Sequence, residues 1–307
     1  MNATLLLPPG APEEEWKAAR RQGVTASEIA VILGISPYDS AFNLYWKKLG
    51  ELPDDFDNTA MSLGRHLEPW IADQWAADHP GAHVGVTGLW RSDERPWQMA
   101  TPDRYVWDKS RSDVDGDSLL EIKSSGTYDG WGEDGSDQIP AYYRAQVLWQ
   151  LDTLGMDRAD VTCFFLSTRQ RRDYTVAYDV TDVYLMRAAA LDFMEQVERR
   201  TPPDIDAHTA TLGALKALNP KVDQDAEAEV PTMLALDYEA ACEAVRLAGA
   251  EKALLENRLR DVMGTAKYAM HAGHKIATRS VYDVAEHVRR AGHVDKLISA
   301  KTPKDPS

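Results

Sequence analysis

The chain of 307 residues is poor in cysteine, with only Cys163 and Cys242. Both lie in runs with strand or helix periodicity, so we expect reduced, buried side chains instead of a disulfide framework or a metal-binding pair. Long apolar runs are also missing, and no basic region precedes the short leucine run near the N-terminus. These absences exclude a membrane span and a secretory signal by the usual criteria, and they favour a cytoplasmic protein.

Positive charge is in deficit. Lysine and arginine total 34 against 49 acidic residues, which gives a net charge of −15. This balance lacks the overall basic character of many nucleic-acid-binding proteins. It does not exclude DNA, because a local basic groove and bound divalent ions can hold a polyanion when distant charges are screened. The eight histidines show no metal-ligand spacing, which argues against zinc.

What the chain does contain is enough apolar material, 44% of its residues, for one sizeable core and a second, smaller unit. Composition divides it into a Pro- and Glu-rich flexible leader, a long patterned region, a Pro- and acid-rich linker, a helical appendage with a short strand pair, and a disordered tail. These parts span residues 1–15, 16–200, 201–229, 230–298 and 299–307.

The patterned region predicts one mixed sheet flanked by helices. Capping signals and periodicity give the order helix, three strands, helix, two strands, helix. The expected helices span residues 25–34, 40–49, 61–78, 140–154 and 182–199, and the expected strands span 83–91, 98–107, 117–124, 160–168 and 173–180. The fold class is therefore α/β with mixed α+β character.

The run LLEIKSS, residues 119–125, raises a chemical question. As a strand it places Leu120 and Ile122 on one face and Glu121 with Lys123 on the other. A half-buried strand with a solvated ion pair gives the same pattern. A metal site, with the carboxylate as ligand and the ammonium beside the reacting atom, requires further carboxylates on that face.

Two other acidic residues can supply them. Asp103 lies at the Pro-Asp step of WQMATPDRYVW, which is commonly just a turn, but a hairpin between Asp103 and Glu121 would bring the two carboxylates onto neighbouring strands. Glu68 precedes Pro69, so it either lies on the apolar stripe of a helix or caps one.

Such a carboxylate set favours one or two hard ions, Mg²⁺ or Mn²⁺. Water on the metal becomes a usable nucleophile, and a second ion can steady the leaving oxygen of a phosphodiester. Lys123 would orient that water or neutralise developing charge. These residues therefore predict metal-assisted phosphodiester hydrolysis.

Five segments extend the pattern in order: RRQGVTASEIAVILGISPY, LGRHLEP, TPDRYV, LLEIKSS and IPAYYRAQVLWQL. Together they resemble the YqaJ-type viral recombinases related to lambda exonuclease, and TPD followed by EIK resembles the signature of the PD-(D/E)XK nuclease superfamily. The resemblance covers roughly residues 16–200. It implies a restriction-endonuclease-like PD-(D/E)XK core that carries a C-terminal helical appendage.

The resemblance also implies roles for the site residues. It assigns Asp103 and Glu121 as metal ligands with the Ile122 carbonyl beside them, Glu68 as a further acidic residue and possible ligand, Lys123 as the catalytic lysine, and Gln146 as a site-organising residue.

A pocket for the 5′-terminal phosphate is implied at RRQGVTASEIA. Thr25 is the predicted N-cap with Glu28 as its capping-box partner, and Ser27 lies in the first turn, where free N–H groups favour an anion. Spacing favours Arg20 as the guanidinium partner, although a one-residue gap would select Arg21. An ordinary capped helix beside two solvated arginines is the alternative from the sequence alone.

Other side chains are candidate DNA contacts. Arg104 stands where the motif usually has glycine, and it could stiffen the turn or contact a phosphate. Trp131 lies in a Gly- and Asp-rich loop, where it could stack on a base. The basic turn RQRR, residues 169–172, could follow a DNA backbone or form a solvated hairpin tip.

We therefore expect a Mg²⁺-dependent deoxyribonuclease. The resemblance implies a 5′-to-3′ exonuclease on duplex ends that generates 3′ single strands for an annealing protein, a homo-oligomer in the form of a trimeric ring, and the host cytoplasm if a phage encodes the chain. Two alternatives remain open at this point: an endonuclease or structure-specific nuclease on the same core, and a non-catalytic DNA-binding or assembly module.

Overall fold

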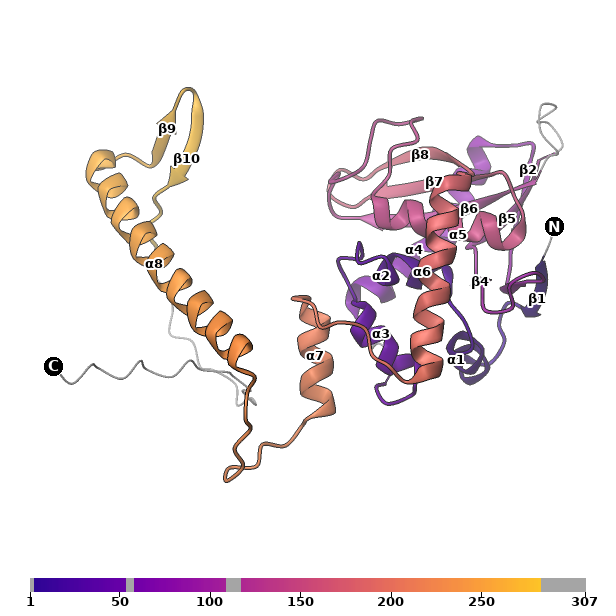
Figure 1. The fold of residues 1–307 in the computed structure, drawn as a ribbon. Helices are drawn as coiled ribbons and strands as arrows, with labels where there is room; N and C mark the ends of the chain where they lie inside the picture. Colours follow the sequence, from indigo (N-terminus) through magenta and orange to yellow (C-terminus); the bar gives the residue numbers. More distant parts are fainter. Residues whose placement is uncertain (1–2, 54–57, 109–116, 283–307) are drawn as a thin grey trace. The chain divides into compact units, whose positions relative to one another are not determined.

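The computed structural model describes residues 3–53, 58–108 and 117–282. The chain divides into two compact units, Met1–Pro220 and Lys221–Ser307, each of which is described by itself (Figure 1). The predicted tail over 299–307 lies outside the described residues. Among those residues, no helix combines the length and the apolar content that crossing a bilayer requires.

A five-stranded mixed sheet forms the centre of the first unit. Its spatial order is β2-β5-β6-β7-β8, and every neighbouring pair is antiparallel except β6 and β7. The strands span Ala82–Val86, Arg104–Asp108, Asp117–Ser125, Arg158–Phe165 and Gln170–Ala177. Parallel neighbours need a crossover connection, and the chain makes it through the helix α5, Ala141–Leu154.

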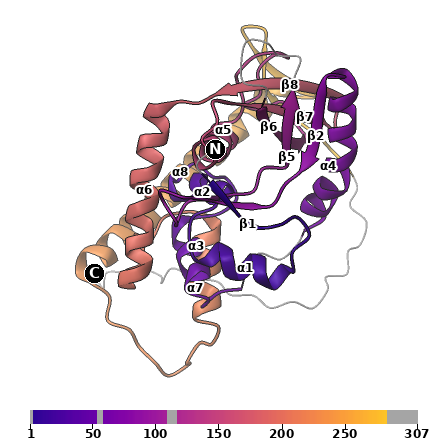
Figure 2. The ribbon, with the colours of Figure 1, turned by 90° about the vertical axis from the view of Figure 1, so that its right-hand side faces the viewer.

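Helices cover both faces of this sheet (Figures 1 and 2). On one face α4, Thr59–Asp78, packs Ile71, Ala72 and Trp75 against apolar side chains of β5 and β6. On the other face lies the main core around α5. The helices α2 and α6, which span Ala26–Ile32 and Val180–Arg199, also contribute to that core. Because both faces are covered, the middle of β6 is buried on both sides.

The helix α5 is buried around most of its circumference. The indole Nε1 of Trp149, in the middle of α5, donates to the backbone carbonyls of Val24 and Met99 at 3.2 and 3.1 Å. The helix ends at Gly155, whose φ of 68° is the left-handed conformation that glycine adopts without strain. These contacts fix the rotation of α5, and thereby the direction in which its glutamines point.

An ionic network anchors the end of α5. The carboxylate of Asp152, with a side chain only 3% exposed, accepts from Arg187 of α6 and from Gln98 Nε2 at 2.7 Å. Burial opposes its ionisation, but the hydrogen bonds from Arg187 and Gln98 hold the pKa of Asp152 below its usual value. The network joins the crossover helix to α6 and to the segment that precedes β4.

We expect Asp152→Asn to lower the free energy of unfolding by about 2 kcal/mol at neutral pH, because it leaves buried donors without a charged acceptor. A depressed pKa contributes stability above the unfolded value of about 3.9 and loses it as pH falls through the folded value. The difference between wild type and variant should therefore shrink below about pH 4.

Denaturant titrations followed by tryptophan fluorescence test this expectation. All nine tryptophans lie in the first unit, so the signal reports that unit alone. Asp192→Asn on the exposed side of α6 is the matched control, since its exposed carboxylate accepts from Gln196 Nε2 of the same helix at 2.8 Å. Equal losses for both variants would contradict a special role for the Asp152 network.

The prediction of a flexible leader over residues 1–15 is wrong for its described part, residues 3–15. The strand β1, Ala3–Leu7, pairs antiparallel with β3, Leu89–Ser92, and β3 pairs with β4, Met99–Ala100. The helix α1 then spans Glu13–Arg21. The leucine run has strand character, and the exposed edge of β3 gives it a partner that composition does not reveal.

The predicted linker over 201–229 also needs correction. It contains the helix α7, Thr209–Leu218, which packs through Ala214 onto Phe42 and Leu52 next to α3, Ala41–Lys48. The unit boundary falls after Pro220. The short apolar stripe of α7 is flanked by Pro- and acid-rich sequence, which masked its periodicity.

Two predicted strands each divide between sheets. Residues 83–91 contribute to β2 and β3, and residues 98–107 contribute to β4 and β5. At the first break Gly88 passes so close to the backbone of Leu7 that a Cβ would lie 2.0 Å from its carbonyl oxygen. The second break is the step Thr101-Pro102-Asp103, where proline cannot donate to a ladder.

The second unit consists of the long helix α8, Thr232–Met263, and a hairpin of β9, Tyr268–His271, with β10, His274–Thr278. The helical appendage and its strand pair were expected in this region. Every described side chain of α8 is at least partly exposed within the chain.

Candidate active site

The hairpin of β5 and β6 brings two predicted carboxylates together. Arg104 at the start of β5 pairs with Leu120, so Asp103 and Glu121 are the next positions along the two strands. Asp103 Oδ2 accepts from the backbone N–H of Ile122 at 2.7 Å. The Pro-Asp step is therefore more than a turn, since it fixes Asp103 against β6.

Glu121 is the centre of the cluster and is only 1% exposed. Its Oε1 accepts from Lys123 Nζ and from Gln146 Nε2, both at 2.6 Å. Its Oε2 accepts from Gln150 Nε2 at 2.8 Å. The ion pair with Lys123 is thus buried, and the interpretation of this face as a solvated strand surface is wrong.

Gln150 is a site residue that sequence reasoning missed. It lies one helical turn after Gln146, and the i, i+4 spacing on α5 was the signal that could have found it. The two amides approach Glu121 from the same helix face and hold both of its oxygens in a fixed orientation.

Lys123 is held on three sides. Its Nζ lies 2.6 Å from Glu121 Oε1, 3.2 Å from Gln146 Oε1 and 4.6 Å from the ring centroid of Tyr143. Burial opposes its charge, but the nearby carboxylates of Glu121 and Asp103 raise the pKa of Lys123 above its usual value. The side chain is therefore a cation at physiological pH.

The negative charge of the cluster is not fully compensated. Burial and the neighbouring Glu121 and Glu68 carboxylates raise the pKa of Asp103 well above its usual range, although Lys123 and the Ile122 N–H act in the opposite direction. Crowded carboxylates of this kind are typical of sites that bind a cation or perform acid-base chemistry.

Glu68 lies inside α4 and does not cap it, because that helix begins at Thr59 and continues through Pro69. Its Oε1 accepts from Arg104 Nη1 at 2.6 Å, and the same nitrogen donates to the carbonyl of Asp103. Arg104, whose side chain is 9% exposed, is thus occupied with Glu68 and the Asp103 backbone. The prediction of Arg104 as a direct DNA contact is corrected accordingly.

Trp131 does not lie in a position to stack on a base. It is 7% exposed and packs in the core against Tyr143, Phe165 and Tyr174. The loop sequence is rich in Gly and Asp, but its backbone folds back onto β8, where Gly132 accepts from Arg172 Nη1 at 2.7 Å. Composition described the loop correctly and gave no information on the side chain's direction.

The donor set fits a hard divalent cation. Asp103, Glu121 and the Ile122 carbonyl offer oxygen atoms, and a carboxylate has about four lone-pair sites, so three hydrogen bonds to Glu121 leave it able to coordinate. In the described part of the chain, no three His, Cys, Asp or Glu side chains already converge as a metal cluster. Besides burial, the close approach of the Asp103 carboxyl to the buried Glu121 raises the pKa of Asp103, and this close approach favours a cation here.

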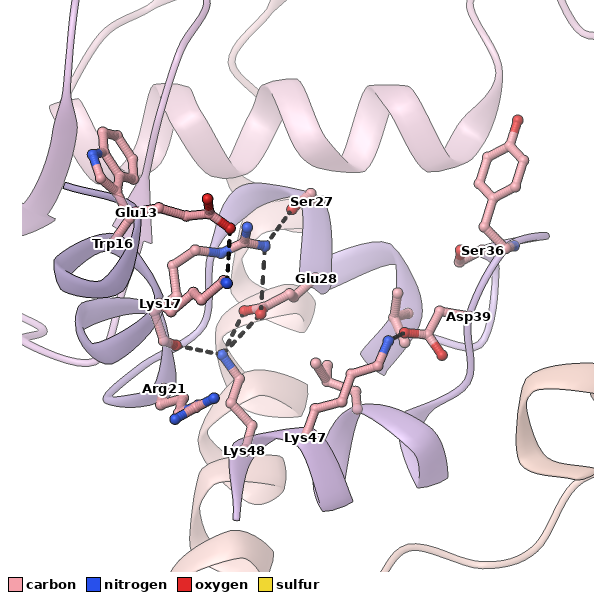
Figure 3. Close-up of a pocket in the computed structure, with 14 residues that line it drawn as sticks. Glu13, Trp16, Lys17, Arg21, Ser27, Glu28, Ser36, Asp39, Lys47 and Lys48 are labelled. Carbon is pink, nitrogen blue, oxygen red and sulfur yellow. Dashed lines mark hydrogen bonds and ion pairs between the residues drawn. The ribbon is translucent and has the colours of Figure 1, made fainter. Parts of the chain in front are cut away.

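A second group of predicted residues meets at the start of α2. Glu28 accepts from the Thr25 N–H at 2.8 Å, as the capping signal predicted, and the same carboxylate pairs with Lys48 Nζ at 2.8 Å (Figure 3). Burial opposes the charge on Glu28, but Lys48 and Arg20 hold its pKa below the usual value. The capping glutamate is therefore also the buried counter-ion of this group.

Arg20 and Ser27 face each other in this region, with Arg20 Nη2 at 3.4 Å from Ser27 Oγ. They line a cavity of about 410 Å³ together with Arg21 and basic side chains of α1 and α3 (Figure 3). Five basic and three acidic side chains line it, a surplus of two positive charges in a strongly acidic chain. The lysines of α3, Lys47 and Lys48, were not predicted, because they come from a separate helix.

A smaller cavity of about 170 Å³ connects the two groups of residues. It shares Trp16, Arg20 and Ser27 with the larger cavity and is also lined by Thr101 and Gln146. Gln146 donates to Glu121, so the basic cavity and the carboxylate cluster adjoin at one glutamine. Arg21 lines only the larger cavity, and the geometry therefore favours Arg20 as the partner of Ser27.

The strand order and the crossover helix define a mixed α/β core, as the sequence predicted, and this core brings Asp103, Glu121 and Lys123 together. A family model of the YqaJ-like viral recombinase domain matches residues 15–157. Residues 15–157 are thus similar to the YqaJ-like viral recombinase domain, and the resemblance stated from the five sequence segments is confirmed over that region.

Individual relatives are similar over limited parts. The "uncharacterized protein YqaJ" of Bacillus subtilis strain 168 is 27% identical over 145 residues, which cover 46% of this chain and 42% of that relative. An alkaline exonuclease, LHK-Exo, from Laribacter hongkongensis has 22% identity and a TM-score of 0.48 over 61% of this chain and 94% of that one. A phage-related exonuclease from Haemophilus somnus 129PT has 12% identity and a TM-score of 0.43 over 60% and 99%.

Proposed function

We propose that this protein is a Mg²⁺- or Mn²⁺-dependent deoxyribonuclease that degrades duplex DNA from its 5′ ends. One observation carries the proposal. Gln146 donates to the central carboxylate, Glu121, and also lines the cavity that contains Arg20 and Ser27. Machinery for phosphodiester hydrolysis and a basic pocket for a terminal phosphate therefore adjoin each other.

In this proposal Asp103 and Glu121 hold one or two cations, with the Ile122 carbonyl and Glu68 as further oxygen donors. Such a cation supplies an acidified water and stabilises charge on the phosphodiester. Gln146 and Gln150 keep the Glu121 carboxylate in one orientation. Lys123, a cation fixed between Glu121 and Tyr143, balances negative charge that develops on the reacting phosphate.

The basic cavity accounts for end dependence. A terminal phosphate carries more charge than an internal phosphodiester, and a guanidinium with neighbouring ammonium groups would favour it. The helix α2 has only seven residues, so the proposal rests on Arg20, Ser27 and the surrounding lysines more than on a helix terminus. Internal strand positions gain nothing from this pocket.

The product of such a reaction is a 3′ single strand. We propose, from the family resemblance, that a strand-annealing protein receives it and that the enzyme is a trimeric ring that stays on its DNA. A closed ring of this kind explains processivity without a strongly basic surface.

The wild-type enzyme should prefer 5′-phosphorylated to 5′-hydroxyl duplex ends, and Arg20→Ala combined with Ser27→Ala should abolish that preference. Each lost charge-assisted hydrogen bond is worth roughly 1.5–3 kcal/mol, which is a tenfold or larger change in rate. The measurement is the degradation rate of linear duplexes that differ only in end phosphorylation, with Mg²⁺ and with chelator.

Arg199→Ala is the matched control, because Arg199 is an exposed arginine of α6 that lines neither cavity. If the double variant distinguishes the two ends as well as wild type, the phosphate pocket lies elsewhere. A covalently closed circular duplex distinguishes the proposed exonuclease from an endonuclease on the same core. An end-dependent exonuclease leaves the circle intact, and an endonuclease cuts it.

A further inference from the structure

The end of the second unit has an unusual charge composition. Residues 264–282 contain Lys267, Lys275, Arg279 and two histidines but no aspartate or glutamate. The whole chain carries a net charge of −15, and the segment before α8 is acidic. A run of this length without a carboxylate is therefore a local reversal of the chain's charge.

This basic segment is an ordered hairpin. β9 and β10 pair antiparallel with His271 opposite His274, and the turn uses Ala272 and Gly273, both with positive φ. The backbone N–H of Arg279 donates to the carbonyl of Lys267 at 2.8 Å, and the Arg279 guanidinium donates to the carbonyl of Gly264. The hairpin base is thus tied to the end of α8.

An aromatic ring lies close to two of the positive charges. The Nζ atoms of Lys267 and Lys275 lie 5.2 and 5.3 Å from the ring centroid of Tyr268. Tyr268, Met270 and Ile276 are 47%, 58% and 58% exposed in the chain. A two-stranded hairpin with so little buried apolar surface is only marginally stable alone, which favours a surface that functions with a partner.

We propose that the β9–β10 hairpin binds single-stranded DNA. Surfaces that hold single strands combine basic side chains for the phosphates with exposed aromatic rings for the bases, and the hairpin offers both within one short ribbon. The absence of any carboxylate distinguishes it from an ordinary protein-binding face, where both signs of charge are usual. This inference rests on the proposed function, because the single strand is the product of that reaction.

Lys267→Gln with Lys275→Gln in the full chain tests the proposal. The probe is a fluorescent 5′-hydroxyl thymidine strand of about 20 nucleotides, longer than the roughly 16 that one single-strand module covers, measured by anisotropy in chelator. Two lost phosphate contacts should weaken binding at least tenfold near 0.1 M salt, and should reduce the slope of log K against log salt by about 1.4. Tyr268→Ala should weaken binding about fivefold or more.

The controls remove the same number of positive charges, or one tyrosine, from α8. Lys252→Gln with Arg260→Gln removes the same charge from exposed positions, and Tyr238→Ala removes a partly exposed tyrosine. These variants should bind within twofold of wild type. Equal affinity of hairpin and control variants for the single strand overturns the proposal. It is also overturned if the hairpin substitutions weaken binding only to duplex DNA or only to an acidic protein.

Degradation of a 5′-phosphorylated duplex is measured with the same wild-type preparation. If wild type fails to degrade it, the proposed nuclease function fails, while the anisotropy data still decide whether the hairpin binds a single strand. If wild type degrades it and the hairpin variants bind as the controls do, only the hairpin inference is lost.

Discussion

Asp103→Asn is expected to reduce cleavage of a 5′-phosphorylated duplex by about 1,000-fold or more. Loss of a cation ligand that acts at the reacting phosphate removes on the order of 4 kcal/mol of transition-state stabilisation, and each 1.4 kcal/mol is a tenfold change in rate. The asparagine can still accept from the Ile122 N–H, so the local backbone is retained. Single-turnover cleavage at saturating Mg²⁺ is the measurement.

The same variant should be as stable as wild type, or more stable, in chelator. An acid whose folded pKa is raised costs stability above that pKa, and the cost disappears as pH falls through it, because the folded state then binds the extra proton. At neutral pH the variant removes this cost. A melting temperature several degrees below wild type would show instead that Asp103 is a structural residue.

Asp117→Asn is the matched control for this variant. Asp117 begins β6, the strand that Asp103 contacts through Ile122, but it lies at the other end of that part of the strand, where its carboxylate accepts from Tyr105 Oη at 2.8 Å. It should leave cleavage within a fewfold of wild type. Losses of similar size in both variants would mean that these two carboxylates matter through folding and not through a metal site.

The sequence predicted those parts of the site that depend on local geometry. Strand alternation predicted Glu121 and Lys123 on one face, and the capping box predicted the hydrogen bond from the Thr25 N–H to the Glu28 carboxylate. Both follow from positions a few residues apart, where the backbone geometry of one element decides the outcome. The Asp103 to Glu121 pairing required only one hairpin and was also predictable.

Features assembled by tertiary packing were not predictable in this way. Lys48 reaches Glu28 from another helix, and Arg104 turns back to Glu68 instead of outward. Trp131 was assigned to a solvated loop from composition, whereas the loop folds over β8 and buries the indole. In each case the direction of a side chain depends on a partner distant in sequence, and a single sequence does not show which distant residues are in contact.

The same distinction applies to the fold. The mixed sheet follows from the strand patterns, and the end of the crossover helix follows from the stop at Gly155. The strand β1 and the helix α7 were missed because each is short, and each is stabilised by a partner, β3 or α3, far along the chain. Propensity alone is a weak guide for such short elements.

Lys123→Met is expected to reduce cleavage by a factor similar to that of Asp103→Asn, but with the opposite effect on stability. The pair with Glu121 is buried, so the small value of an exposed ion pair does not apply. A lysine with a raised folded pKa contributes its full stabilisation below the unfolded value, which includes neutral pH. Its removal should therefore lower the free energy of unfolding by about 3 kcal/mol in chelator, as expected for a buried charge left unpaired.

The combination of Lys123→Met with Asp103→Asn separates catalysis from charge balance. The second change removes one of the carboxylates that Lys123 compensates, so the double variant should regain part of the lost stability and none of the lost activity. Lys216→Met on the exposed side of α7 is the matched control and should change neither quantity. Unchanged cleavage by Lys123→Met would return Lys123 to a structural role. Strictly additive changes in stability in the double variant would contradict a shared carboxylate cluster, since coupled charges must show a non-additive term.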